Sequence, residues 1–112
     1  MKIGIIAAME EELRLLLENL LDCQEHQVLS NTYYTGHYGQ HDLILVQSGI
    51  GKVMSAMTVA ILVDHFQAEA IINTGSAGAV SPELAIGDVV VAEQLVYHDV
   101  DVTAFGLSLI HI

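Results

Sequence analysis

The pattern that most constrains the fold is an apolar strand that runs directly into an amphipathic helix. Residues 2–8 (KIGIIAA) are apolar at nearly every position, which is typical of a strand covered on both faces in a parallel sheet. The next stretch, EEELRLLLENLL (residues 10–21), carries leucines at helical spacing. These leucines are Leu13, Leu16, Leu17, Leu20 and Leu21. A buried strand followed at once by such a helix predicts an α/β fold.

The middle of the chain predicts a hairpin and a second helix. Residues 22–30 are polar, and we expect a loop there. Residues 31–49 (NTYYTGHYGQHDLILVQSG) favour two strands joined by a turn at Gly39-Gln40. Residues 49–66 begin with glycines and continue as an apolar helix.

Two further apolar runs follow this second helix. Residues 68–80 (AEAIINTGSAGAV) predict a buried strand that ends in a loop of small residues. Residues 85–99 (AIGDVVVAEQLVYHD) predict another strand, entered through Gly87-Asp88. Strands that alternate with helices indicate βαβ units, and the hairpin makes the expected sheet a mixed one.

The charge balance limits the classes of partner. The 112 residues are 53% hydrophobic, enough for the core of one domain, and the formal net charge is −11. A strongly acidic surface repels phosphate backbones and anionic lipids, so we expect neither nucleic acid nor a membrane as a partner. A small molecule or another protein fits better.

The single cysteine and the N-terminus indicate a soluble, cytoplasmic protein. Cys23 has no second cysteine with which to form an internal disulfide, and such usage suits a reducing compartment. The apolar run at residues 3–8 is too short for a signal peptide. No apolar run reaches the ~20 residues that a membrane-spanning helix needs.

The last residues differ in character from the rest. The chain finishes LSLIHI, apolar and without a capping helix or turn. We interpret residues 1–106 as the N-terminal portion of a single domain of a longer fold, and residues 107–112 as a tail foreign to it. The alternative is that an apolar C-terminal strand completes a small domain.

Three consecutive glutamates at the start of the first helix have an ordinary explanation. Carboxylates in the first helical turn are stabilised by free N–H groups and the helix dipole. Glu10 has Arg14 four residues on as an ion-pair partner, and Glu11 points away from the leucines. Glu12 borders the leucine stripe without a basic partner. It is therefore the carboxylate we expect at a cleft at the carboxyl end of the first strand, where partial desolvation would raise its pKa and suit it to acid–base chemistry.

Two small-residue stretches follow predicted strands. SGIGK (residues 48–52) fails the phosphate-loop pattern because Val46 occupies the position of its first glycine. It either brings backbone close to a ligand or begins a helix. NTGSAGAV (residues 73–80) has almost no side-chain bulk, so it is either a ligand-binding backbone loop or a tight turn.

The six histidines are scattered and form no metal-binding pattern, so we expect no metal site. The stretch YHDVDVTAFG (residues 97–106) sets His98 and two aspartates beside apolar residues. An acid–base site and a polar loop with an apolar anchor both remain open there.

Five motifs, taken in order and spacing, resemble one enzyme family. They are IGIIAAMEEE, SGIGKV, INTGSAG, IGDVVVAE and YHDVDVTAFG. Together they closely resemble the 5'-methylthioadenosine/S-adenosylhomocysteine nucleosidases, the hydrolytic branch of the nucleoside phosphorylase superfamily. The resemblance runs from Met1 to about Gly106 and covers about the first half of a family member. It implies the N-terminal part of a three-layer α/β fold with a mixed central sheet.

The resemblance also implies a reaction and a site. It implies hydrolysis of the N-glycosidic bond between adenine and a 5'-thio-substituted ribose in methionine salvage, with Glu12 activating the attacking water and with no metal or cofactor. The positions that match the family's water, ribose and purine pocket are Ala8, Met9, Ile50, Ser76, Ala77 and Gly78. Val102 and Phe105 match positions that contribute to the pocket of the neighbouring subunit in a homodimer.

Part of the family's machinery has no counterpart in these 112 residues. The aspartate that protonates purine N7 and the glutamate that binds the ribose hydroxyls belong to the family's second half. We therefore expect negligible turnover from this chain alone. Two alternatives remain open: a nucleoside phosphorylase of the same superfamily, and a non-catalytic binding or dimerisation module. The few basic residues argue against a phosphate site, which favours arginines near its glycine loop.

Overall fold

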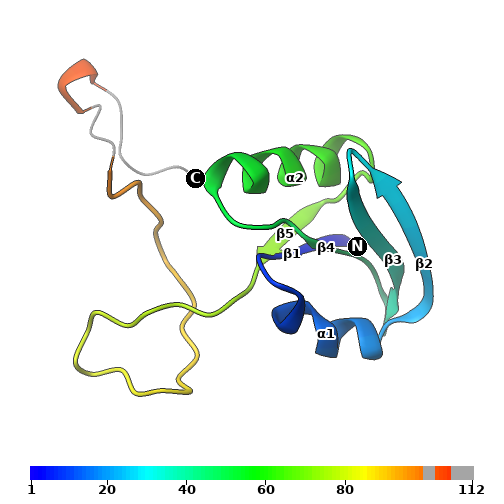
Figure 1. Cartoon of the computed structure of the whole chain (residues 1–112), viewed down its shortest axis with the longest axis horizontal. Coiled ribbons are helices and arrows are strands. Elements are labelled where there is room, and N and C mark those ends of the chain that lie inside the picture. The colour runs from blue at the N-terminus through cyan, green and yellow to red at the C-terminus, as the bar shows by residue number, and fades with distance from the viewer. Residues whose placement is uncertain (100–102, 107–112) are drawn as a thin grey trace. The chain divides into compact units, whose positions relative to one another are not determined.

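The computed structural model describes residues 1–99 and 103–106 (Figure 1). The chain divides into two compact units, residues 1–77 and residues 78–112. All five strands and both α-helices of the described residues lie in the first unit. The described part of the second unit holds one short 3-10 helix, Thr103–Phe105.

The first unit is built on a mixed five-stranded sheet with the order β2-β3-β4-β1-β5. β1 pairs in parallel with both β4 and β5, whereas β2, β3 and β4 pair antiparallel. The predicted α/β fold with a mixed sheet is therefore confirmed. The strands are β1 (Lys2–Ala7), β2 (Leu21–Val28), β3 (Asn31–Tyr38), β4 (His41–Gln47) and β5 (Ala70–Asn73).

Two helices cover opposite faces of the sheet, α1 (Glu10–Glu18) and α2 (Lys52–Asp64) (Figure 1). Successive strand residues point to opposite faces, so Ile5 packs in the cluster that contains Leu13 of α1, and Ile6 packs in the cluster that contains Leu62 of α2. This arrangement gives the first unit the three predicted layers.

The first helix is shorter than the leucine pattern predicted. It ends at Glu18, where Asn19 is the C-cap and its side-chain amide donates to the Leu15 carbonyl at 2.7 Å. Leu20 is buried just beyond the helix, but Leu21 is exposed and begins β2. The prediction of a loop over residues 22–30 was therefore wrong. β2 lies at the edge of the sheet and is mostly exposed, so its pairing with β3 needs no apolar alternation.

The predicted hairpin is confirmed. β3 and β4 pair up to Tyr38 and His41, across a turn at Gly39-Gln40. The apolar core of β4, from Leu43 to Val46, is fully covered between the two helical layers. This strand pairs in parallel with β1, so the carboxyl ends of both strands lie at the same edge of the sheet.

The strand predicted over residues 85–99 is not formed. A turn is present, since Asp88 donates its N–H to the Ala85 carbonyl at 3.1 Å and accepts the Ala85 N–H at 2.9 Å. Beyond it, Val89, Val90 and Val91 are exposed, and no strand is assigned among the described residues of this segment. Val96 alone is assigned as an isolated β-bridge residue, which is too short to be a strand. What stabilises a strand is packing against cross-strand neighbours more than intrinsic propensity.

No helix in the described part of the chain is long and apolar enough to cross a membrane.

Candidate active site around Glu12

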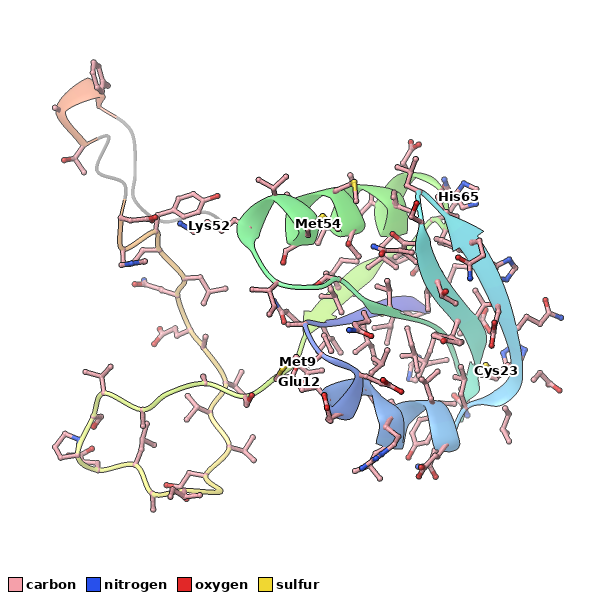
Figure 2. All side chains as sticks on the ribbon, in the orientation of Figure 1. Met9, Glu12, Cys23, Lys52, Met54 and His65 are labelled. Atoms are coloured by element: carbon pink, nitrogen blue, oxygen red, sulfur yellow. The ribbon has the colours of Figure 1, made fainter. Side chains whose placement is uncertain are left out.

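Glu12 lies where two parallel strands finish at the same edge of the sheet. β1 ends at Ala7 and is followed by Ala8 and Met9, and β5 ends at Asn73 three residues before Ser76. Figure 2 shows Met9 and Glu12 side by side where α1 begins. Carboxyl ends of parallel strands are the usual ligand-binding edge of an open α/β sheet.

The Glu12 carboxylate joins the two segments through four hydrogen bonds. Its Oε2 accepts the backbone N–H groups of Ala8 at 3.2 Å and Met9 at 3.1 Å. Its Oε1 accepts the backbone N–H of Ser76 at 2.9 Å and the Ser76 hydroxyl at 3.0 Å. Since a carboxylate offers about four lone-pair positions, all of its acceptor capacity is used.

One half of this arrangement is a helix start. Met9 is the N-cap residue of α1 and Glu12 is its N3 residue, so the bond from the Met9 N–H to the carboxylate is the N3 half of a capping box. The ordinary explanation of the glutamates is therefore correct for Glu12 as well. The bonds from Ser76, 64 residues away in sequence, are additional to capping.

The hydrogen bonds shift the Glu12 pKa in the direction opposite to our prediction. The backbone N–H of Ser76, then that of Met9 and the Ser76 hydroxyl, lower the pKa below its ordinary value of 4.5, and they outweigh the opposing effect of desolvation. Donors to a carboxylate stabilise its charged form. The predicted raised pKa was wrong, because the neighbours of the carboxylate are N–H and O–H donors and not apolar surface.

The other two glutamates behave as helix-start residues. Glu10 and Glu11 are both exposed in the first turn of α1. Within residues 1–99 and 103–106, no ion pair joins Glu10 to Arg14, so the predicted partner is not engaged. Helix dipole and solvent are sufficient to explain these two carboxylates.

The loop after β4 begins α2. Ser48 donates its N–H to the Ala7 carbonyl at 2.8 Å, which fixes the end of β4 against the end of β1. Gly51 is the N-cap of α2 with a φ of 111°, a conformation that favours glycine. The helix-start reading of SGIGK is thus confirmed. Ile50 is 83% exposed at this edge, and its predicted contact with substrate remains a prediction.

Four predicted site residues remain: Ala77, Gly78, Val102 and Phe105. Ala77 is exposed next to Ser76 at the end of the first unit. Gly78 and Phe105 belong to the second unit, and the Phe105 side chain is 82% exposed. Val102 lies outside the described residues, as does the predicted tail at residues 107–112.

Gly75 and Ser48 belong to the two small-residue stretches, but neither was among the predicted site residues. Gly75 lies directly against the Glu12 carboxylate, and Ser48 is a buried polar residue whose hydroxyl donates to the Gly49 carbonyl at 2.8 Å. The cluster of small residues around Gly75 was the available signal. One of the two interpretations of this loop was that a ligand contacts its backbone. In the structure, the group that contacts the backbone there is the Glu12 carboxylate.

Two hollows lie in the first unit, and Glu12 lines neither. The larger, of about 510 Å³, lies between α1, the β2–β3 turn and the end of β4, with Leu13 and Ser48 among its lining residues. The smaller, of about 300 Å³, is bordered by Lys2 and by His37 and Asp42, whose side chains are paired at 2.6 Å. The carboxylate lies at the strand ends, outside the lining of both hollows.

Titratable groups elsewhere form no second centre of this kind. In the part of the chain that the structure describes, no three His, Cys, Asp or Glu side chains are grouped so as to hold a metal ion. His98 lies 3.8 Å from Asp99 in the second unit, and its side chain is almost fully exposed. Asp101 of the same stretch lies outside the described residues, so both interpretations of this stretch remain predictions.

The family assignment follows from comparison with known proteins. The family described as the phosphorylase superfamily matches residues 2–109. The chain belongs to the phosphorylase superfamily. A curated relative, the 5'-methylthioadenosine/S-adenosylhomocysteine nucleosidase of Colwellia psychrerythraea, is 47% identical over 109 residues, which cover 97% of this chain and 45% of the relative.

Solved structures agree with this assignment. The crystal structure of S-adenosylhomocysteine nucleosidase from Streptococcus pyogenes, in complex with 5-methylthiotubericidin, matches with a TM-score of 0.93 and 78% identity. The match covers 100% of this chain and 48% of the S. pyogenes chain. The structure of the S. pneumoniae 5'-methylthioadenosine/S-adenosylhomocysteine nucleosidase with a transition-state inhibitor matches with a TM-score of 0.92 and 65% identity. This match covers 97% of this chain and 47% of the S. pneumoniae chain.

Both comparisons identify the same relatives. This phosphorylase-superfamily chain resembles the methylthioadenosine/adenosylhomocysteine nucleosidases, as its motifs predicted. It spans about half the length of the curated relatives that it matches.

Proposed function

We propose that Glu12 is the base that activates water for hydrolysis of the N-glycosidic bond of 5'-methylthioadenosine and S-adenosylhomocysteine. The observation that carries the proposal is the position of its carboxylate. It lies at the carboxyl ends of β1 and β5, bound by Ala8 and Met9 on one side and by Ser76 on the other. The names of the relatives supply the reaction and the substrate class.

The proposed step needs one base and one oriented water. The water oxygen bonds to C1' of the ribose while Glu12 accepts its proton, and the C1'–N9 bond breaks with its electron pair passing to adenine. Adenine takes up a proton from a general acid, which the family resemblance assigns to an aspartate beyond the matched region. The products are adenine and the 5-thio-substituted ribose. The proposed step parallels that of an inverting glycosidase, in which acid and base act on opposite sides of the sugar.

The lowered pKa of Glu12 has two consequences for this role. The carboxylate is charged at neutral pH, as a base must be, but its four donors leave no free lone pair for water. Three donors are backbone N–H groups, and the fourth is the Ser76 hydroxyl. Only the hydroxyl can rotate away without moving the backbone, so we propose that water replaces it when substrate binds.

A chimera tests the base directly. In it, residues 1–106 of this chain replace the aligned segment of the Streptococcus pyogenes nucleosidase, to which the chain is 78% identical. We expect hydrolysis of methylthioadenosine, measured as adenine release, and a fall in kcat of about 10²–10⁴-fold for Glu12→Gln. Glu11→Gln, an exposed neighbour, is the matched control. A Glu12→Gln chimera with unchanged kcat would refute the assignment.

The chain alone is proposed to lack significant turnover. The described residues position a base, but the resemblance assigns the general acid and the ribose-binding glutamate to the family's second half, beyond the matched region. Adenine release by the purified 112-residue chain should therefore be no faster than that by the Glu12→Gln variant of the same chain. Turnover close to that of the chimera would show that the chain is sufficient by itself.

A phosphorylase is the second candidate, because the superfamily carries that description. The chain has only three basic residues. Lys2 begins β1, at the opposite end of the strand from Glu12, and Arg14 and Lys52 are exposed. Phosphate sites are usually built with basic fork-like donors, so we favour water as the nucleophile. Activity of the chimera that depends absolutely on phosphate would reverse this preference.

The oligomeric state and the cellular location are also proposals. We propose a homodimer of the longer protein, in which Val102 and Phe105 contribute to the thioalkyl pocket of the neighbouring subunit. The exposed Phe105 side chain is available for such a contact. We also propose a cytoplasmic location, because the free thiol of Cys23 is exposed and would be oxidised outside a reducing compartment.

A further inference from the structure

The requirement for glycine at residue 75 comes from the close approach of the Glu12 carboxylate and not from the backbone conformation. Its φ lies outside the left-handed range that disfavours side chains. A Cβ atom at this position would lie 3.0 Å from Glu12 Oε1 and 3.2 Å from both Cδ and Oε2. Contacts of this length are tighter than nine in ten real Cβ contacts, so the carboxylate would have to move by a few tenths of an ångström.

The carboxylate cannot move without losing hydrogen bonds. Oε2 is held by the N–H groups of Ala8 and Met9, and Oε1 by the N–H and hydroxyl of Ser76. Ser76 adjoins Gly75 in the chain, so a displacement away from residue 75 also lengthens the bonds to Ser76. Oε1 is the atom closest to the added Cβ and is also the atom that Ser76 binds.

We propose that Gly75 is a positioning residue for Glu12, because the absence of a side chain at residue 75 lets the carboxylate reach the Ser76 donors while it caps α1. The link from this positioning to catalysis rests on the proposed function. The positioning itself rests on the contacts of the two residues alone.

The Glu12 titration curve in the 112-residue chain tests the proposal. Glutamate labelled with ¹³C at the carboxyl carbon reports each pKa by NMR, with Glu12 assigned by its loss in Glu12→Gln. In Gly75→Ala we expect the Glu12 pKa to rise toward its ordinary value, because the Ser76 donors are lengthened. Ser76→Ala should raise it in the same direction by removing one of those donors.

Gly78→Ala is the matched control. Gly78 lies in the same small-residue stretch, has no positive φ, and an added Cβ there meets no atom within 4 Å. Its Glu12 titration should coincide with that of the unmodified chain. A Gly75→Ala chain that folds and titrates like the unmodified chain would overturn the proposal.

A double variant keeps the test decisive if Gly75→Ala does not fold. Adding Glu12→Ala removes the carboxylate that the new methyl group meets, so the double variant should recover the folded far-UV circular dichroism spectrum of Glu12→Ala alone. Failure to recover would show that the added methyl disturbs something other than Glu12. The Glu12 titration and the circular dichroism spectrum are both measured without substrate. They can therefore contradict the positioning role of Gly75 while the chimera still hydrolyses methylthioadenosine. Conversely, the positioning role can be supported while the chimera is inactive.

Discussion

Glu12 shows how one side chain serves both the start of a helix and a long-range link between strand ends. Its Oε2 satisfies N–H groups at the beginning of α1, and its Oε1 binds Ser76 across the edge of the sheet. A charged acceptor makes stronger hydrogen bonds than a neutral one. The ionised carboxylate therefore stabilises the arrangement in which the candidate site exists.

The stability of the first unit should depend on the ionisation of Glu12. Its pKa is lowered in the folded chain from an ordinary value of 4.5, so folding favours the charged form. The resulting stabilisation is present above the pKa of the unfolded chain and is lost as the pH falls through the lower, folded pKa. Glu12→Gln should lower the free energy of unfolding at neutral pH and flatten its decline in acid. Urea unfolding over a series of pH values measures both.

Glu11→Gln provides the control for this measurement. Glu11 neighbours Glu12 in the same helical turn and is exposed, and no side-chain hydrogen bond of Glu11 is found among the described residues. Its pH dependence should parallel that of the unmodified chain. If the Glu12→Gln curve were also parallel, the hydrogen bonds to the carboxylate would contribute nothing to stability.

The resemblance placed Glu12 in one site with Ala8, Met9 and Ser76, but it did not predict that these three donate hydrogen bonds to the carboxylate. Helical spacing placed Glu12 beside the leucine stripe, and the resemblance gave it a role. The contact with Ser76 joins residues 64 positions apart, and it depends on the register with which β5 pairs to β1. Local pattern contains no information about that register, so the sign of the pKa shift could not be predicted.

At the scale of elements, α1 illustrates how amphipathic spacing becomes packing. Leu13 is 2% exposed and packs with Ile5 and Leu45 on one face of the sheet, whereas Leu15 is 69% exposed. Both are leucines within one helix, so they differ in burial and not in chemistry.

Leu13→Ala should destabilise the first unit by about 2–5 kcal/mol, because it removes buried methyl groups and leaves a cavity in the core. Leu15→Ala, the matched control, should change the free energy of unfolding by no more than about 0.5 kcal/mol. Urea unfolding monitored by circular dichroism measures both. Similar losses in the two variants would show that Leu13 is not a core residue.

Two strand assignments show where periodicity fails. β2 was missed because an edge strand can be polar and exposed while its backbone pairs fully with β3. The strand over residues 85–99 was predicted from its valines, yet those valines are exposed. Both errors have one cause: a strand is defined by its neighbour, which propensity does not specify. Buried strands such as β1 and β4 were recognised because burial on both faces leaves an unbroken apolar run.

At the scale of the whole molecule, the core that the structure describes lies in one part of the chain. Among residues 1–99 and 103–106, both hydrophobic clusters and all five strands lie within residues 1–77. The four donors to Glu12 come from the same residues. The family assignment, by contrast, spans residues 2–109.

A chain that ends after Ala77 should therefore fold and keep the Glu12 contacts. We expect cooperative urea unfolding and a Glu12 titration that matches that of the 112-residue chain, because every residue of the two described core clusters is retained. The Leu13→Ala variant of the shortened chain should unfold at lower urea, which confirms that the same core is measured. Non-cooperative unfolding of the shortened chain would show that residues 78–112 contribute to its stability.

Glu12 has structural contacts as well as a proposed catalytic role, and this affects what its presence in a related sequence indicates. A descendant that abandoned the reaction would still be selected to retain this carboxylate, since losing it would expose the start of α1 and release the segment after β5. Its persistence in a genome is therefore weak evidence of enzymatic activity.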